Sequence, residues 1–315
     1  MQISGIHHIT AIAGNPQQNV DFYTAVLGLR MVKLTVNFDD PGTYHLYYGN
    51  EVGHPGTVLT FFPFRDAPKG RRGTGQATTI AFSIPEGAMG YWIDHFKGHN
   101  VPFENPEARF DEEALVFYDP DGLKLELVAY ADDDRLPWEG GPVPPERAIL
   151  GFYSVALSEE GYERTAALLT ETLGFRATQE HGDRYRYEAG AGGPGAVVDV
   201  LCHPTEIASR VAVGTVHHVA WRTPDDDAQA AWRKTIAALG YNVTPVMDRQ
   251  YFHSIYFREP GGVLFEIATD PPGFTKDETV AELGSGLKLP PWLEPRRDLI
   301  AQALPPLWLP GEGSQ

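Results

Sequence analysis

Short apolar runs, bounded by glycine, proline and charged residues, recur along this chain and predict β-strands. Two of them carry adjacent histidines: SGIHHITAI at residues 4–12 and GTVHHVAW at residues 214–221. Successive side chains of a strand point to opposite faces, so the two histidines of a pair cannot face the same side. In the first run His8 shares a face with Thr10, and His7 points the other way. The second run repeats this arrangement.

Two longer segments also recur. Residues 22–32 (FYTAVLGLRMV) are similar to residues 168–178 (LLTETLGFRAT), and each reads as a helix end closed by a glycine. Residues 117–130 and 257–270 both read as a strand, a turn with proline and glycine, and a second strand with a central glutamate. These repeats divide the chain into four units, and each unit reads as a strand, then a helix, then several strands. They begin near Gly5, Ala77, Ile149 and Thr215.

Connectors of distinct composition separate these units. Residues 64–76 are basic and rich in glycine, and residues 131–148 are acidic and rich in proline. We therefore expect an N-terminal half at residues 1–135 and a C-terminal half at 147–270. Residues 271–315 match none of the units and are expected to form a tail that covers one barrel.

Composition restricts the partners. The length of 315 residues suits about two domains, and 42% hydrophobic with 21% charged residues indicates a globular chain. A formal charge of −17 argues against nucleic acid or an anionic membrane as partner, because both need a basic surface. One cysteine excludes a disulfide within the chain, and no apolar run reaches the roughly 18 residues of a membrane span. With no signal-peptide pattern, we expect a cytoplasmic protein.

Four βαβββ-like units in one chain resemble the vicinal oxygen chelate superfamily, which includes glyoxalases, bleomycin-resistance proteins and extradiol ring-cleaving dioxygenases. The resemblance covers residues 1–270, and its most specific marks are the strand histidines and the D-P-D-G or E-P-G-G turn before a glutamate strand. It implies an α+β fold in which two units close into a barrel-like cup. It also implies a metal held by inward side chains of the first and last strands of each unit.

The pairing of the units then decides the candidate metal site. The first and last strands of unit one offer His8 and Thr60, and those of unit two offer Thr79 and Glu126. Those of unit three offer Ser154 and Asp199, and those of unit four offer His218 and Glu266. Pairing consecutive units gives neither cup two histidines. Pairing unit one with unit four gives His8, His218 and Glu266, with Thr60 as a non-ligand. Such a set leaves coordination positions open and favours non-haem Fe(II) chemistry with O2. We therefore expect pairing 1+4 and 2+3, with the second cup metal-free.

The resemblance is closer still to the hydroquinone-type ring-cleaving dioxygenases. It is carried by GIHHITAIAGNPQQNVDFYTAVLGLRMVK near the start, by DRQYFHSIYFREPGGVLFEIATD, and by LPPWLEPRRDLIAQALPPL in the tail. Carried over by position, it implies metal ligands His8, His218 and Glu266, and pocket residues His7, Thr10, His217, Arg249 and Tyr256.

That resemblance implies an enzyme: an Fe(II)-dependent, extradiol-type dioxygenase that uses O2 to cleave a hydroquinone-like or catechol-like aromatic. Mn2+ or Zn2+ is an alternative to Fe2+ in the purified protein. Arg249 is expected to stabilise a charged ring oxygen, Tyr256 to position substrate or relay a proton, and His7 or His217 to act as acid or base. The partners are a small aromatic and O2; a homo-oligomer is left open.

Two other functions stay open. A glyoxalase-like isomerase or lyase would share the fold, but it resembles a four-ligand site with two carboxylates, from which Thr60 departs. A metal-free small-molecule-binding protein would need no ligand triad. Glu126 and Asp199 stand at the corresponding positions on the last strands of units two and three, but no pair of histidines accompanies either of them. We therefore interpret both as structural. Metal analysis identifies the binding protein, and oxygen uptake with hydroquinone separates the two enzymes.

Overall fold

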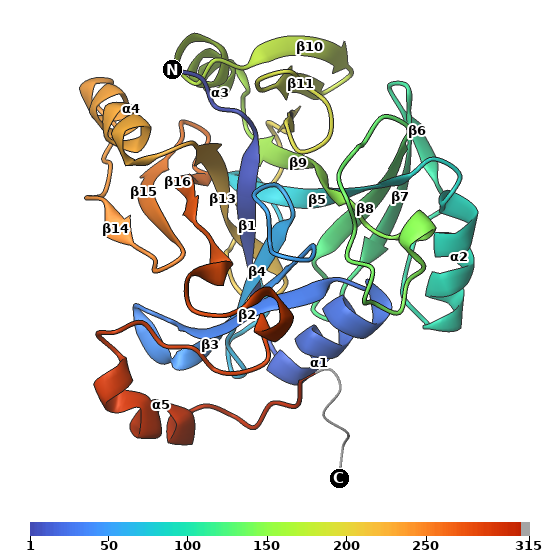
Figure 1. The fold of residues 1–315 in the computed structure, drawn as a ribbon. Helices are drawn as coiled ribbons and strands as arrows, with labels where there is room; N and C mark the ends of the chain where they lie inside the picture. Colours follow the sequence, from blue (N-terminus) through green and yellow to red (C-terminus); the bar gives the residue numbers. More distant parts are fainter. Residues whose placement is uncertain (310–315) are drawn as a thin grey trace.

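The structure, a computed structural model, describes residues 1–309 and contains two eight-stranded sheets (Figure 1). The strands of the first sheet are β1 (Ile6–Ala13), β2 (Arg30–Asn37), β3 (Asp40–Gly49), β4 (Val58–Pro63), β13 (Thr215–Thr223), β14 (Met247–Asp248), β15 (Phe252–Arg258) and β16 (Leu264–Pro272). The strands of the second sheet are β5 (Gln76–Pro85), β6 (Glu107–Arg109), β7 (Glu112–Tyr118), β8 (Lys124–Tyr130), β9 (Gly151–Glu159), β10 (Arg176–His181), β11 (Arg184–Glu188) and β12 (Val197–Cys202).

The α-helices are short and lie outside the sheets (Figure 1). They are α1 (Pro16–Asp21), α2 (Met89–Gly98), α3 (Glu163–Ala167), α4 (Asp226–Ala238) and α5 (Arg297–Ala303). Two of them continue into a π-helical turn, η1 (Phe22–Val26) after α1 and η3 (Leu168–Thr172) after α3. Both turns are followed by a glycine with positive φ, at 69° in Gly28 and 80° in Gly174. These glycines terminate the helices at the repeated positions that the sequence indicated.

Strand order shows which units share a sheet. The first sheet runs β14-β15-β16-β13-β1-β4-β3-β2, and the second runs β10-β11-β12-β9-β5-β8-β7-β6. Units one and four therefore form one sheet, and units two and three form the other, which confirms the expected 1+4 and 2+3 pairing. At the centre of each sheet the first strands of two units pair antiparallel, β1 with β13 and β5 with β9. Each sequence half contributes to both sheets, so the boundaries at 135 and 147 stay predictions.

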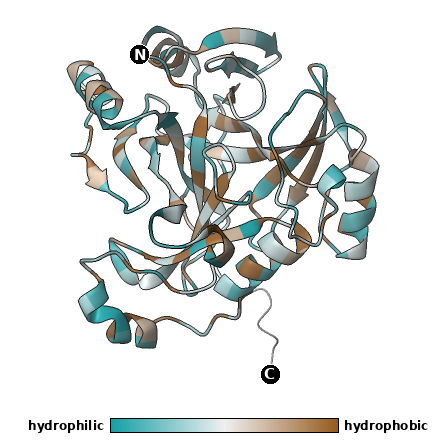
Figure 2. Cartoon of the chain, in the orientation of Figure 1, coloured by the Kyte–Doolittle hydropathy of each residue, from teal (hydrophilic) through white to brown (hydrophobic). Residues whose placement is uncertain are grey.

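The central strand β1 is completely buried. It pairs with β13 on one edge and with β4 on the other, and all eight of its residues are buried. Hydrophobic residues concentrate along such central strands, whereas the helices show mixed colouring (Figure 2). A buried strand is an expensive place for imidazole unless the ring is paired, so His7 and His8 require partners there.

The tail packs on the sheet of units one and four. The backbone amide of Lys288 donates to the carbonyl of Leu34 at 2.9 Å, and the Tyr44 hydroxyl donates to the carbonyl of Pro305 at 2.9 Å. Within residues 1–309 no helix is long and apolar enough to cross a membrane.

Candidate metal centre

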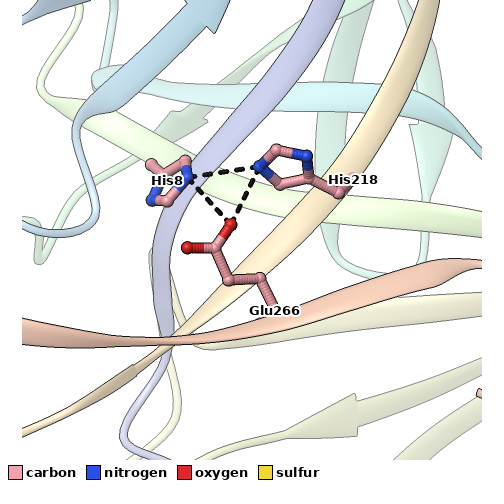
Figure 3. Close-up of side chains that lie close together, drawn as sticks. All are labelled: His8, His218 and Glu266. Atoms are coloured by element: carbon pink, nitrogen blue, oxygen red, sulfur yellow. Dashed lines mark hydrogen bonds and ion pairs between the residues drawn. The ribbon is translucent and has the colours of Figure 1, made fainter. Parts of the chain in front are cut away.

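Three side chains from three neighbouring strands converge in the first sheet (Figure 3). His8 is on β1, His218 on β13 and Glu266 on β16, and all three are buried. The Glu266 Oε2 atom lies 3.0 Å from His218 Nε2 and 3.4 Å from His8 Nε2, and the two Nε2 atoms lie 3.3 Å apart. Among the described residues, this is the one set of three or more His, Cys, Asp or Glu side chains whose ligand atoms lie within 4.8 Å of one another.

The charge and hydrogen bonding of this set suit a cation. Glu266 Oε1 accepts from the Ser254 hydroxyl, whereas the buried Oε2 accepts no hydrogen bond. Burial alone would raise the pKa of Glu266, but the imidazoles of His8 and His218 hold that pKa well below its usual range. Burial lowers the pKa of His218. A carboxylate facing two imidazole nitrogens, with no Lys or Arg paired to it among residues 1–309, is an uncompensated buried charge that a divalent ion would satisfy.

In each histidine pair, the residue outside the triad contacts the ring of the triad residue. The Nδ1 atoms of His7 and His8 lie 2.8 Å apart, and those of His217 and His218 lie 2.7 Å apart. Burial lowers the pKa of His7 well below its usual value and that of His217 to about 3, so both rings are neutral at pH 7. If His8 and His218 keep the Nε2 lone pair for a metal, the ring hydrogen of each sits on Nδ1. It is then donated to Nδ1 of His7 or of His217. This contact would fix the tautomer and the orientation of each ligand.

A cavity of about 610 Å³ opens over the triad. Its lining residues are His8, Ile12, Asn37, Phe38, Asp39, His45, Tyr47, Phe62, Phe64, His217, His218, Thr244, Met247, Arg249, Phe252, Tyr256 and Leu264. Nine of the lining side chains are aliphatic or carry a phenyl or phenol ring, and the other eight are histidine, polar or charged. This mixture suits a small aromatic ligand that carries polar groups.

Tyr256 approaches the triad from β15, the strand next to β16, and Arg249 approaches from the turn between β14 and β15. Tyr256 stands directly opposite Glu266 in the β15–β16 ladder. Burial raises the pKa of Tyr256, so its phenol remains protonated. Arg249 donates from Nε to the Tyr256 hydroxyl at 3.2 Å. The turn that carries Arg249 has a left-handed residue, Gln250 with φ of 68°, whose carbonyl accepts from Lys276 of the tail at 3.0 Å.

His7 and Thr10 lie behind the cavity lining. The His7 ring packs against His8 and Phe252, with ring centroids 5.1 Å away in both cases. The Thr10 hydroxyl lies 2.8 Å from the hydroxyl of Thr60. Of the five pocket residues expected from the resemblance, His217, Arg249 and Tyr256 line the cavity, and these two do not.

The sequence reasoning missed the contribution of β3 and of the turn before it. His45 Nε2 lies 2.9 Å from the Thr60 hydroxyl, and His45 Nδ1 lies 2.8 Å from the Tyr47 hydroxyl. Asp39 accepts from Arg249 at 3.0 Å. The alternation of TYHLYY was the available signal, since His45 and Tyr47 are two positions apart and share a strand face.

In the second sheet the corresponding acidic side chains are paired with arginines. Glu126 accepts from Arg109 at 2.7 Å, and Asp199 accepts from Arg184 at 2.7 Å and from Arg186 at 2.8 Å. Burial alone would raise the pKa of Asp199, but the guanidinium of Arg186 holds it below its usual range. These carboxylates are compensated by side chains of the protein itself.

Comparison with known proteins gives consistent matches. Residues 5–127 and 152–267 match the Glyoxalase/Bleomycin resistance protein/Dioxygenase superfamily. A Bacillus subtilis (strain 168) protein, MhqO, whose name describes a ring-cleaving dioxygenase, is 50% identical over 302 residues, which is 96% of each chain. The chlorohydroquinone/hydroquinone 1,2-dioxygenase of Sphingobium indicum is 37% identical over 312 residues, again 96% of each chain. A crystal structure from Bacillus subtilis, described as that of a dioxygenase, is 48% identical, covers 98% of both chains and has a TM-score of 0.94.

Proposed function

The chain belongs to the glyoxalase/bleomycin resistance protein/dioxygenase superfamily, and on that basis we propose that it is a metal-dependent, ring-cleaving dioxygenase. The substrate is a hydroquinone-like or catechol-like aromatic, which is opened with consumption of O2. The observation that carries this proposal is the convergence of His8, His218 and Glu266, of which the two histidines line a cavity with several aromatic side chains. The names of relatives that align over almost the whole chain support it.

The metal that we propose is Fe2+, held by His8, His218 and Glu266. Two histidines and one carboxylate leave positions open for other ligands, which is the donor set of non-haem Fe(II) oxygenases. Iron at such a site supplies Lewis acidity toward a phenolic hydroxyl and redox chemistry with O2. Mn2+ or Zn2+ remains an alternative occupant of the purified protein. We also keep the expectation of a cytoplasmic enzyme, which rests on composition.

Side chains around the cavity have distinct tasks in this proposal. Arg249 carries a permanent charge and stabilises negative charge that develops on the ring oxygen during the reaction. Tyr256 remains a neutral phenol, so it donates a hydrogen bond or passes a proton to the substrate. His217 lines the cavity as a neutral imidazole and accepts or donates at the ring edge.

A hydroquinone makes these positioning groups more important than a catechol would. Its two hydroxyls stand on opposite sides of the ring, so only one lies beside the bond that is cut and the substrate cannot chelate. Orientation then depends on hydrogen bonds and ring contacts from the cavity wall, which here include Phe62 and Phe252.

Anaerobic reconstitution with Fe(II), followed by oxygen-electrode screening, tests the proposal. Hydroquinones, catechols and the hemithioacetal of methylglyoxal are offered in parallel. We expect one O2 to disappear for each ring opened. Conversion of the hemithioacetal without oxygen uptake, and with no diphenol consumed, would instead establish a glyoxalase-like isomerase. A protein that retains no metal and turns over none of them would be a binding protein.

A further inference from the structure

We infer that Tyr47 binds the second hydroxyl of the diphenol as a hydrogen-bond donor, and that His45 is the positioning residue that fixes Tyr47 in this role. The second hydroxyl is the one that lies farther from the metal. This role deepens the proposed function of the same site and rests on it. A chain of hydrogen bonds, which runs from the interior of the first sheet to the cavity wall, supports it.

The chain has four members and three contacts. Thr10 Oγ1 lies 2.8 Å from Thr60 Oγ1, and Thr60 Oγ1 lies 2.9 Å from His45 Nε2. His45 Nδ1 lies 2.8 Å from the Tyr47 hydroxyl. His45 and Tyr47 line the cavity, whereas the two threonines are completely buried and do not line it. The chain therefore has a buried end at Thr10 and an end at the cavity at Tyr47.

The number of hydrogens leaves two arrangements of this chain. Burial lowers the pKa of His45 well below its usual value and raises the pKa of Tyr47 well above its usual value, so both rings are neutral near pH 7. Each of the four groups then brings one hydrogen, and each of the three contacts uses one. The remaining hydrogen lies either on Thr10 or on Tyr47. In the first case Tyr47 donates to His45, and in the second case His45 Nδ1 donates to Tyr47.

Burial favours the second arrangement. Among residues 1–309, the Thr10 hydroxyl has no hydrogen-bond partner except Thr60, so a hydrogen left over at Thr10 would have no acceptor. A buried donor without an acceptor is costly. A hydrogen left over on Tyr47 can instead be accepted by a ligand oxygen in the cavity. Tyr47 therefore accepts from His45 and donates into the cavity, and accepting one hydrogen bond strengthens the other.

Strand positions assign Tyr47 to the oxygen farther from the metal. Tyr47 stands opposite Thr60 on β4, and Thr60 stands opposite Thr10 on β1. Neighbouring strands lie about 4.8 Å apart, so two strand spacings separate Tyr47 from the nearest strand that carries a ligand. Tyr256 stands only one spacing from Glu266. Tyr256 is thus the phenol beside the metal, and Tyr47 is placed for the other ring oxygen.

The hydroxyl of Tyr47 can be removed without changing the packing of its ring. Tyr47→Phe keeps the ring, whose centroid lies 5.2 Å from that of Phe274. The neighbouring Tyr48 points to the opposite face of β3, is not part of the cavity lining and donates to Asn19 at 2.9 Å. Tyr48→Phe therefore loses a buried hydrogen bond of the same kind and is the matched control.

The first test compares three phenols that differ at the para position: hydroquinone, 4-methoxyphenol and 4-methylphenol. The methoxy group can only accept a hydrogen bond, and the methyl group can do neither. Calorimetric titration of Fe(II)-loaded protein without oxygen gives Kd for each. We expect Tyr47→Phe to weaken the first two about tenfold, the effect of one lost hydrogen bond, and to leave 4-methylphenol unchanged. Tyr48→Phe should change none of the three, and iron content should be equal in all proteins.

The second test locates the hydrogen of His45. Nitrogen-15 NMR of the histidine rings is recorded on Zn2+-loaded protein, and the His45 signals are assigned by their loss in His45→Gln. We expect the hydrogen on Nδ1 and the lone pair on Nε2. A hydrogen on Nε2 would show that Tyr47 donates to His45, and would overturn the positioning role.

Equal losses for all three phenols in Tyr47→Phe would overturn the binding role of Tyr47, as would an unchanged Kd for 4-methoxyphenol. If the binding pattern follows the expectation but hydroquinone consumes no oxygen, the role of Tyr47 in binding stands and ring cleavage is the part that fails. Oxygen consumption with hydroquinone, together with unchanged binding in Tyr47→Phe, would leave the proposed function standing and remove Tyr47 from it.

Discussion

The Nε2 atoms of His8 and His218 lie 3.3 Å apart although the two residues are 210 positions apart in the chain. They meet because β1 and β13 pair antiparallel at the centre of one sheet, where Thr10 stands opposite His218 and His8 opposite Ala220. The candidate metal site therefore depends on the pairing of unit one with unit four, since neither sequence half holds both histidines.

The first prediction concerns metal content. Replacing Glu266 by Gln removes the charged donor and leaves an amide between two imidazoles, so occupancy should fall sharply, by roughly 10-fold or more in affinity. Glu126→Gln removes a carboxylate at the equivalent strand position of unit two, where Arg109 is its partner. That variant should keep wild-type metal content by elemental analysis. Equal losses in the two variants would mean that the metal site is not where we place it.

The sequence was sufficient for the strand faces and for the pairing of the units. Strand alternation indicated that only one histidine of each pair can face the triad, and the resemblance to the superfamily indicated that these are His8 and His218. The absence of two histidines in any consecutive pair of units indicated the 1+4 arrangement. Parity alone did not reveal that His7 and Thr10 lie behind the lining. The β1–β13 ladder has irregularities between Ile6 and His8 and after Thr10, and these change the register locally.

The pattern of hydrophobic and polar positions could not predict contacts between turns that are distant in the chain. Asp39 stands in a hairpin turn whose sequence is that of an ordinary solvated turn. It contacts Arg249 because the sheet curves, so that the β2–β3 edge meets the opposite edge, which is formed by β14 and β15. The turn that carries Arg249 likewise contacts the tail, since Lys276 donates to the carbonyl of Gln250. Neither partner has a periodicity or spacing that would indicate the other.

The second prediction tests the charge of Arg249. Arg249→Met keeps a long side chain but removes the cation, so iron should remain bound while the rate of ring opening falls by roughly 10²-fold, the effect of losing one charge-stabilising donor. Oxygen uptake measures the rate of ring opening, and iron analysis measures the bound metal. Arg176→Met, on the exposed edge strand β10, is the control and should change neither. A fully active Arg249→Met would make this side chain a bystander.

The third prediction concerns the hydroxyl of Tyr256. Tyr256→Phe retains the ring that packs 5.7 Å from His218 and removes only the group that accepts from Arg249. If the hydroxyl positions substrate or passes a proton, kcat should fall and its dependence on pH should change shape, with iron content unchanged. An unchanged pH profile together with an unchanged kcat would exclude both roles.

The last prediction follows from a proton shared between the two sheets. The Thr165 hydroxyl lies 2.6 Å from Oε2 of Glu159, at the end of β9, and 2.6 Å from Oε2 of Glu259, in the turn before β16. One hydroxyl hydrogen can satisfy only one of these contacts, so a carboxyl group must supply the other. Glu259 accepts from the backbone amides of Gly261 and Val263.

The Oε1 atom of Glu159 is buried without a partner, so Glu159 is the residue that holds the proton. Burial, followed by the charge of Glu259, raises the pKa of Glu159 to about 8. The folded protein therefore binds a proton that the unfolded chain releases near pH 4.5. The stabilisation is complete below that pH and is lost as pH rises through about 8, with a slope of at most about 1.4 kcal/mol per pH unit.

Glu159→Gln should remove this dependence, because the amide supplies a hydrogen at every pH. The variant and wild type should unfold at similar denaturant concentrations near pH 5, and above pH 8 the variant should be the more stable of the two. Urea unfolding across pH 5 to 9 measures both curves, with Glu160→Gln as a control at the neighbouring exposed position. Parallel curves for wild type and Glu159→Gln would show that no proton is shared at Thr165, and that one of the two short contacts is absent in solution.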